Sequence, residues 1–189
     1  MTSEREKAAL RVRLRGLRRR LAQARPDAAA LAAEHLPLER LPAFDLFGAY
    51  FAQGSEMDPR PVIRRLEHAG GRCALPVAAG RDGLLEFRVW TAGDALVPDA
   101  VGVPSPLPEA RVVQPALVIA PLLAFDRQGG RLGQGGGHYD RTLENLRAQG
   151  PVFVLGLAYA GQEAPAIPME PHDQRLDAIL TEDGYFEVG

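Results

Sequence analysis

The chain has 189 residues, of which 46% are hydrophobic, and this is enough for one domain with a substantial core. Its single cysteine, Cys73, excludes an intramolecular disulfide and a metal site built from cysteines. We expect Cys73 to pack as a small buried hydrophobic residue, and the low cysteine content fits the reducing cytoplasm. No apolar run approaches the roughly 20 residues that span a bilayer, and no apolar segment follows the charged N-terminus. We therefore expect neither a membrane span nor a secretory signal.

The net charge of −2 is unevenly distributed along the chain. Residues 1–25 carry nine basic and two acidic side chains, whereas the remainder carries thirteen basic and twenty-two acidic ones. Such a basic N-terminus is typical of proteins that bind nucleic acid, an anionic membrane or a phosphate-rich ligand, and it is also ordinary helix surface. No aromatic residue lies among these basic side chains, which argues against nucleic acid.

The N-terminal residues predict an amphipathic helix. Ser3 and Glu6 have the spacing of a capping box, which marks a helix start. Lys7, Arg11 and Arg18 fall along one flank of the apolar stripe, where charged tips can reach into a neighbouring cleft. The stripe itself consists of leucines spaced four, three and four residues apart, namely Leu10, Leu14, Leu17 and Leu21.

Helical and strand patterns alternate through the rest of the chain, which predicts a single α/β domain over residues 1–189 with a mostly parallel sheet flanked by helices. The strand at 84–90 has alternating polarity and is expected to be antiparallel or at an edge. The segment 93–115 contains five prolines and is expected to be irregular, as a pocket wall. Glu56 follows the first strand, at the edge where open α/β sheets bind ligands, and is either a ligand contact or a solvated loop carboxylate. The predicted helices are 27–35 and 60–69, and the predicted strands are 44–52, 72–78, 84–90, 116–123, 151–159 and 178–181.

The strand at 116–123 leads into a glycine-rich loop, after which a helix is expected to begin near His138, with Gly150 as its C-terminal cap. Strand, glycine loop and helix start is an arrangement that brings backbone amides together around an anion. Within the loop, Arg131 supplies a cationic fork for phosphate, and Asp140 at its exit is suited to a magnesium ion. A flexible linker or a β-hairpin is the alternative interpretation. The loop has neither the Lys-Ser/Thr of a Walker motif nor the spacing of a dinucleotide fingerprint.

Four segments together resemble the 5-formyltetrahydrofolate cyclo-ligase family, also called methenyltetrahydrofolate synthetase. They are Lys7-x-x-x-Arg11, Glu56, the loop from Arg131 to Asp140, and His172-Asp173 before the last strand. The most specific part is the run AFDRQGGRLGQGGGHYDR, followed about 30 residues later by PHDQRLDAILTE. The resemblance covers nearly the whole chain. It implies a parallel-rich sheet flanked by helices, in the group that includes sugar-phosphate isomerases and coenzyme A transferases.

The resemblance also implies an activity, which is the ATP- and Mg²⁺-dependent conversion of 5-formyltetrahydrofolate, with or without a polyglutamate tail, to 5,10-methenyltetrahydrofolate. In that reaction the γ-phosphoryl group of ATP moves to the formyl oxygen and gives an iminophosphate. N10 of the folate then attacks the activated carbon, and phosphate leaves. The family further implies a cytoplasmic monomer that acts on a small molecule, without nucleic acid or membrane partners.

Carried over residue by residue, the resemblance assigns roles to particular side chains. Asp140 and Asp173 match the magnesium carboxylates, and Phe51 and Glu56 match positions that line the folate, where a carboxylate suits the N–H donors of the pterin. Residues Gln134, Gly135, Gly136, Gly137 and His138 are expected to face both ligands. The catalytic assignment falls on Arg131, His138 and Tyr139. The nucleotide assignment falls on Lys7, Arg11, Arg131, Leu132, Gly133, Gln134, Gly135, Gly136, Gly137, His138 and Tyr139.

The chain departs from the family pattern inside the loop. Gln134 and His138 stand where the family has aromatic residues, and Gly136 stands where many relatives have lysine. These changes favour a second hypothesis, a non-catalytic relative that binds formylfolate or nucleotide as a buffer or regulator. The presence of both presumed metal carboxylates, Asp140 and Asp173, argues for the enzyme.

Overall fold

A computed structural model describes residues 4–188, with side chains from residue 8 onward. The helices are α1 (Glu4–Ala24), α2 (Ala28–His35), α3 (Arg60–His68) and α4 (His138–Gln149), with short 3₁₀ turns at Leu38–Arg40 and Ala160–Gln162. The strands are β1 (Leu46–Gly48), β2 (Arg72–Ala78), β3 (Leu85–Val89), β4 (Leu96–Pro98), β5 (Pro104–Pro106), β6 (Val112–Val113), β7 (Leu117–Ala120), β8 (Ala124–Phe125), β9 (Arg131–Leu132), β10 (Phe153–Leu157), β11 (Ala178–Thr181) and β12 (Gly184–Glu187). Within this part of the chain, no helix is both long enough and apolar enough to cross a membrane.

Eight strands form the main sheet in the order β12-β11-β10-β7-β1-β2-β3-β6. The five strands from β11 to β2 are parallel, while β12, β3 and β6 are antiparallel to their neighbours. Two small antiparallel hairpins, β4–β5 and β8–β9, lie outside this sheet. The predicted mostly parallel α/β fold is therefore confirmed.

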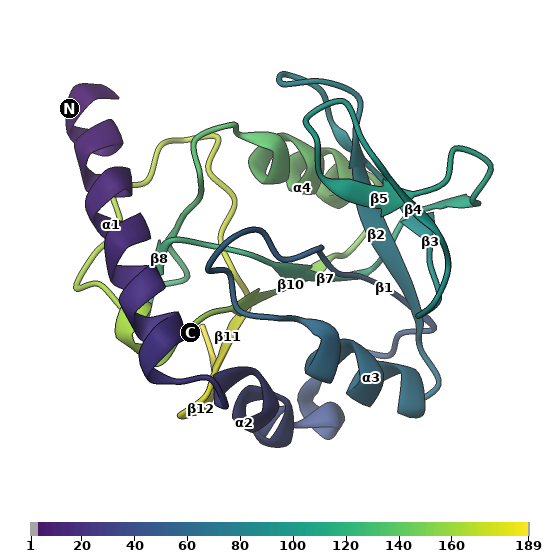
Figure 1. The fold of residues 1–189 in the computed structure, drawn as a ribbon, viewed down its shortest axis with the longest axis horizontal. Coiled ribbons are helices and arrows are strands. Elements are labelled where there is room, and N and C mark those ends of the chain that lie inside the picture. The colour runs from purple at the N-terminus through teal and green to yellow at the C-terminus, as the bar shows by residue number, and fades with distance from the viewer. Residues whose placement is uncertain (1–3, 189) are drawn as a thin grey trace.

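Helices cover both faces of the sheet, as Figure 1 shows with α2 and α3 below the central strands and α4 above them. Strand β7 explains why both faces are covered, since all four of its residues are buried. Leu117 and Ile119 pack in the core that α2 and α3 complete, and Val118 and Ala120 pack in the core that α4 completes. A strand that is apolar on both faces must be covered on both.

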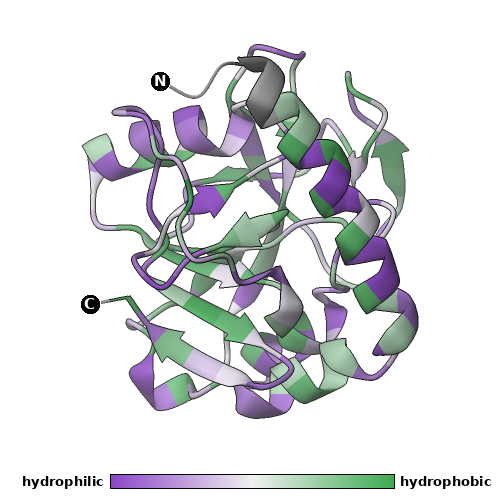
Figure 2. Cartoon of the chain, turned by 90° about the vertical axis from the view of Figure 1, so that its left-hand side faces the viewer, coloured by the Kyte–Doolittle hydropathy of each residue, from purple (hydrophilic) through white to green (hydrophobic). Residues whose placement is uncertain are grey.

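Helix α1 packs beside the β8–β9 hairpin rather than over a face of the sheet. Its Leu14 is buried in a small cluster with Leu123, Leu132 and Ile167, and Leu10 and Leu17 pack around that cluster. Figure 2 shows hydrophobic and hydrophilic residues alternating around α1, as expected for a helix with one buried face. The predicted leucine stripe is confirmed for these residues, whereas Ser3 of the predicted capping box lies outside the described residues.

Three predicted segments differ from the structure. The apolar run 44–52 contributes only the three residues of β1, because residues 49–52 leave the sheet as a loop in which Ala49 and Tyr50 are buried and Phe51 is exposed. Strand β7 ends at Ala120, where Pro121 cannot donate a hydrogen bond to the ladder. The proline-rich segment 93–115 is not wholly irregular, since it forms β4, β5 and β6. Its prolines tolerate strand geometry because Pro98 pairs with Pro104 at the edge of a two-stranded hairpin.

Candidate functional site

The connections of the sheet diverge between β1 and β7. The chain passes from β1 through α3 to β2 on one side, and from β7 through α4 to β10 on the other. Ligands of open α/β sheets bind beyond the carboxyl ends of the strands at such a switch point. A cavity of about 360 Å³ lies there, with a wall from the hairpin residues Asp99, Val101 and Val103.

The cavity brings together every predicted site residue whose side chain is described. Helix α1 contributes Arg11, the loop after β1 contributes Phe51 and Glu56, and Asp173 comes from the segment before β11. The side chain of Lys7 lies outside the described residues. The contribution that follows β7 is the largest and comprises Arg131, Leu132, Gly133, Gln134, Gly135, Gly136, Gly137, His138, Tyr139 and Asp140.

The glycine-rich segment divides into a hairpin and a loop, so the hairpin alternative applies to its first part. Gly129 and Gly130 form the turn between β8 and β9, where Asp126 accepts the backbone N–H of Gly130 at 2.8 Å and that of Ile167 at 2.7 Å. A methyl group on Gly129 would lie 2.6 Å from the carbonyl oxygen of Leu176. This turn is therefore tightly fixed rather than flexible.

The loop proper spans residues 133–137 and ends at α4. Gly135 has φ +105° and packs against the guanidinium of Arg11, to which a methyl group there would approach within 3.3 Å. Gly137 has φ +66° and occupies the N-cap of α4, where no side chain caps the first amides of the helix, and the first residues of α4 line the cavity. The predicted helix from His138 and its cap at Gly150 are confirmed.

Arg131 lies in strand β9, not in a loop, and is buried. Its Nη2 donates to Asp140 Oδ1 at 2.7 Å, and the same oxygen accepts the backbone N–H of Gln174 at 3.1 Å. The guanidinium carbon of Arg131 lies 5.8 Å from the centre of the Tyr139 ring. The Nε of Arg131 and the hydroxyl of Tyr139 are buried without a described hydrogen-bond partner, and burial raises the pKa of Tyr139.

The two predicted magnesium carboxylates, Asp140 and Asp173, both line the cavity. Gln174, which donates to Asp140, directly follows Asp173, whose Oδ2 accepts the backbone N–H of Glu170 at 2.7 Å. No group of three His, Cys, Asp or Glu side chains among the described residues forms a complete metal cage. Two carboxylates nevertheless fit Mg²⁺, which commonly takes one or two from the protein and completes its shell with phosphate oxygens and water.

Glu56 is not a solvated loop carboxylate, because its side chain is only 8% exposed. Its Oε1 lies 3.5 Å from Nη1 of Arg18, and its Oε2 accepts the backbone N–H of Gln53 at 2.8 Å. Burial disfavours the charged form of both side chains. It therefore raises the pKa of Glu56 despite these two partners and lowers the pKa of Arg18. Arg18 also donates to the Leu122 carbonyl at 3.1 Å, so its tip reaches the core edge as its helical position predicted.

His138 links the glycine loop to the turn between β2 and β3. Its Nε2 donates to the carbonyl of Gly80 at 2.8 Å. Nearby, Arg141 donates to the carbonyl of Gly136 at 2.9 Å, and Thr142 Oγ1 accepts the backbone N–H of Leu85. The start of α4 is thus fastened to a second loop of the molecule.

Sequence reasoning missed several residues that shape the site. Asp126 had a detectable signal, because an Asp three and four residues before a glycine pair is typical of a turn in which the side chain accepts backbone N–H groups. Tyr50 is buried at the cavity and donates to the carbonyl of Met57, and Arg15 donates from Nε to Gln134 Oε1 at 2.9 Å. The sequence contained no local signal for these last two contacts.

The fold and the cavity define a class, namely open, mostly parallel α/β proteins with a ligand cavity at the switch point of the sheet. A family model described as "5-formyltetrahydrofolate cyclo-ligase family" matches residues 3–182. The 5-formyltetrahydrofolate cyclo-ligase of Escherichia coli K12 is 36% identical over 137 residues, covering 70% of this chain and 75% of the relative. That of Mycolicibacterium smegmatis is 34% identical over 141 residues, covering 70% and 71%.

Two solved structures share the fold. The 5,10-methenyltetrahydrofolate synthetase of Mycoplasma pneumoniae has a TM-score of 0.71 and 23% identity, and the match covers 94% of this chain and 99% of that one. The Aquifex aeolicus 5,10-methenyltetrahydrofolate synthetase also has a TM-score of 0.71 and 23% identity, with coverage of 96% and 92%. The chain belongs to the 5-formyltetrahydrofolate cyclo-ligase family, a family of ligases.

Proposed function

We propose that this protein converts 5-formyltetrahydrofolate to 5,10-methenyltetrahydrofolate with ATP and Mg²⁺, releasing ADP and phosphate. One observation carries the proposal beyond family membership. Three buried donors on the cavity wall have no described partner, namely Nε of Arg11, Nε of Arg131 and the hydroxyl of Tyr139. Buried donors are normally satisfied, so this cluster suits an anionic ligand such as a phosphate chain.

The chemistry explains why such a site is needed. A formamide oxygen is a poor leaving group, and ATP supplies the phosphoryl group that makes it a good one. N10 then attacks the formyl carbon and loses its proton, and the C–O bond breaks as phosphate departs. Phosphoryl transfer is mainly positioning and charge neutralisation, and Arg11, Arg131 and the amides at the start of α4 meet both needs.

The acidic residues would serve the other partners of the reaction. Asp140 and Asp173 would hold Mg²⁺, whose charge offsets that of the phosphates. Arg131 donates to Oδ1 of Asp140, so a metal held by Asp140 and the guanidinium would both act on the same end of the cavity. Glu56, when ionised, accepts N–H donors of the pterin, and Phe51 offers an aromatic surface that is 39% exposed.

The test follows the absorbance of the methenyl product on mixing protein, 5-formyltetrahydrofolate, Mg²⁺ and ATP. We expect product only when ATP and Mg²⁺ are both present. Arg131→Ala should lower kcat by about 100-fold or more, the loss typical of a removed charge-stabilising donor. Asp140→Asn should raise the Mg²⁺ concentration needed for half-maximal rate.

Matched controls come from the same elements. Arg127→Ala removes an exposed arginine of the β8–β9 turn that pairs with Glu163, and Glu144→Gln removes an exposed carboxylate of α4. Both should keep the wild-type rate. Loss of rate in the controls equal to that in the site variants would contradict the assignment of Arg131 and Asp140.

A non-catalytic relative remains the second candidate, and one observation favours it. Asp140 Oδ1 already accepts hydrogen bonds from Arg131 and from the backbone N–H of Gln174. These two donors compete with a metal ion for that oxygen. Binding of 5-formyltetrahydrofolate without ATP-dependent turnover would favour this candidate over the ligase.

We further propose that the protein acts in the cytoplasm as a monomer with no nucleic acid partner. Cys73 is a free, buried thiol whose pKa is raised by burial. A free thiol is typical of proteins in a reducing compartment. Retention on DNA that salt abolishes would contradict the exclusion of nucleic acid.

A further inference from the structure

Arg18 and Glu56 form a buried ion pair beside the candidate active site. Their side chains are only 5% and 8% exposed, and Nη1 of Arg18 lies 3.5 Å from Oε1 of Glu56. Glu56 lines the active-site cavity, whereas Arg18 lines a separate hollow between α1 and the turn after β1. Arg18 can therefore act on a ligand in the cavity only through a residue that lines it.

The guanidinium of Arg18 is held in place by two neutral partners. Its Nε donates to Oγ of Ser55 at 3.2 Å, in the residue that precedes Glu56. Its Nη1 donates to the carbonyl of Leu122 at 3.1 Å, in the segment after β7. These bonds fix the position of the fork and leave its positive charge to be neutralised by Glu56.

The carboxylate of Glu56 has three partners, and one of them is charged. Its Oε2 accepts the backbone N–H of Gln53 at 2.8 Å, and the side chain of Gln134 donates a further hydrogen bond to it. Arg18 supplies the positive charge. A carboxylate has about four acceptor positions, so one remains for a donor in the cavity.

The ionised state of Glu56 depends on Arg18. The other titratable side chains that face Glu56 are Tyr50 and Tyr139, and burial raises the pKa of both, so neither is ionised at pH 7. Burial also raises the pKa of Glu56, although its three partners all act to lower it. Loss of the positive charge would shift the carboxylate further toward its neutral form.

We propose that Arg18 is a positioning residue for the folate, which acts through Glu56 by holding that carboxylate ionised and in place at the cavity wall. The inference rests on the proposed function, in which Glu56 accepts N–H donors of the pterin. An ionised carboxylate presents only acceptors, whereas a protonated one carries an O–H and loses an acceptor position. Folate binding is therefore strongest while Glu56 is charged, and Arg18 extends this state to lower pH.

The test measures the dissociation constant of 5-formyltetrahydrofolate by calorimetry between pH 5 and 8, without ATP so that no turnover occurs. In the wild-type protein, affinity should fall as the pH falls through the raised pKa of Glu56. Arg18→Gln removes the charge and keeps a polar tip, and it should move the midpoint of this fall upward by about one pH unit or more. The difference from wild type should shrink as the pH rises, because Glu56 then ionises without Arg18.

Two further variants separate this role from a structural one, which would weaken binding by the same factor at every pH. Arg18→Lys keeps the charge without the guanidinium fork, and its midpoint should stay close to that of wild type. Arg18→Gln/Glu56→Gln should be as insensitive to pH as Glu56→Gln alone, because the group that titrates is absent from both.

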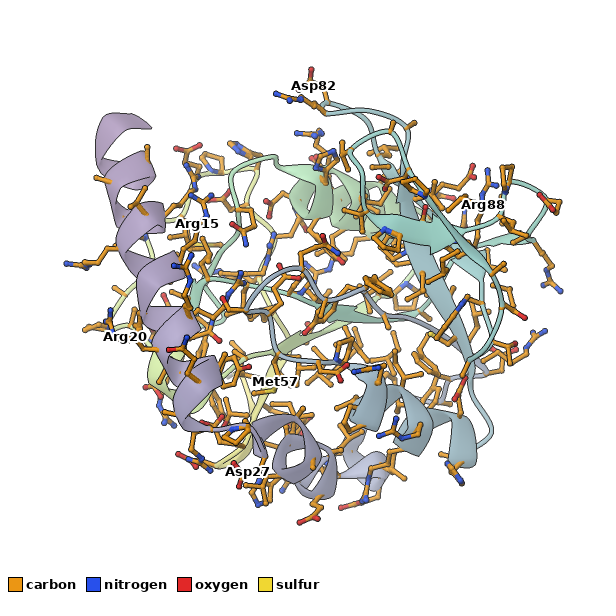
Figure 3. All side chains as sticks on the ribbon, in the orientation of Figure 1. Arg15, Arg20, Asp27, Met57, Asp82 and Arg88 are labelled. Atoms are coloured by element: carbon orange, nitrogen blue, oxygen red, sulfur yellow. The ribbon has the colours of Figure 1, made fainter. Side chains whose placement is uncertain are left out.

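A matched control comes from the outer side of α1. In Figure 3 Arg15 lies on the inner side of the helix, toward the rest of the molecule, and Arg20 lies on the outer side. Arg20 is exposed and lines neither hollow. Arg20→Gln removes the same charge from the same helix and should keep the wild-type midpoint, because solvent and salt screen an exposed charge.

The outcomes distinguish this inference from the proposed function. A wild-type midpoint in Arg18→Gln, with a wild-type protein that converts the folate, would overturn the inference and leave the proposed function standing. An upward shift of a full pH unit in Arg18→Lys or in Arg20→Gln would also overturn it, and Arg18→Lys gives this answer even if Arg18→Gln does not fold. Failure of the wild-type protein to bind or convert the folate would overturn both.

Discussion

Removal of the Asp126 side chain should destabilise the hairpin that carries Arg131. The carboxylate is 4% exposed and accepts three backbone N–H groups, from Gln128, Gly130 and Ile167, at 3.0, 2.8 and 2.7 Å. The donors of Gly130 and Ile167 belong to buried residues, and each buried group left without a partner costs about 1–3 kcal/mol. We therefore expect Asp126→Ala to lower the free energy of unfolding by roughly 2–6 kcal/mol, a large share of the roughly 5–15 kcal/mol typical of a domain.

Urea unfolding at pH 7, followed by the fluorescence of the single tryptophan, Trp90, measures this loss. Asp94→Ala is the matched control, because Asp94 is exposed and accepts one backbone N–H, that of Thr91, at 2.9 Å. The control should change the free energy of unfolding by no more than about 1 kcal/mol. A loss below about 1 kcal/mol in Asp126→Ala, with an unchanged slope against urea, would refute the reasoning.

Two further predictions concern the active-site carboxylate and the glycine turn. Because burial raises the pKa of Glu56, its protonation begins at a less acidic pH than for an exposed glutamate. If the ionised form binds the pterin, folate affinity falls as the pH falls through that raised pKa, and calorimetry between pH 4.5 and 7 should show this loss in the wild type and a flat profile in Glu56→Gln. Gly129→Ala should cost at least about 2 kcal/mol, because φ is +80° and the new methyl group would lie 2.6 Å from the Leu176 carbonyl. Gly102→Ala, with φ +86° and nothing within 4 Å, should show only the smaller backbone penalty, so equal losses in thermal or urea unfolding would contradict a steric role for Gly129.

The sequence predicted those elements whose apolar pattern is bounded by breakers. Strand β11 was expected at Ala178–Thr181 and lies there, and α4 begins at His138 and ends before Gly150 as expected. The run 44–52 was predicted as one strand because its residues are apolar, but only Leu46–Gly48 form a strand. Apolar residues indicate burial, and a partly buried loop can be as apolar as a strand. The hairpin β4–β5 was not predicted, because its prolines are typical of irregular segments.

The sequence allowed the residues of the candidate site to be named, but not the contacts between them. Arg131 and Asp140 were named because their types suit phosphate and magnesium, whereas Phe51 and Asp173 were named only by resemblance to the family. Their pairing was out of reach, since Arg18 meets Glu56 across 38 positions and Arg15 meets Gln134 across 119. Such contacts depend on how α1 packs beside the β8–β9 hairpin, which no local pattern specifies. Asp126 is the exception, because its turn pattern is local.

The central claim is that this protein uses ATP to close the folate ring, and one measurement tests it most directly. Methenyltetrahydrofolate and ADP are quantified in the same sample after a limited reaction of wild-type protein with 5-formyltetrahydrofolate, Mg²⁺ and ATP. The account predicts equal amounts of the two products, and neither without the folate. ADP without methenyl product, or methenyl product formed equally well without ATP, would contradict it.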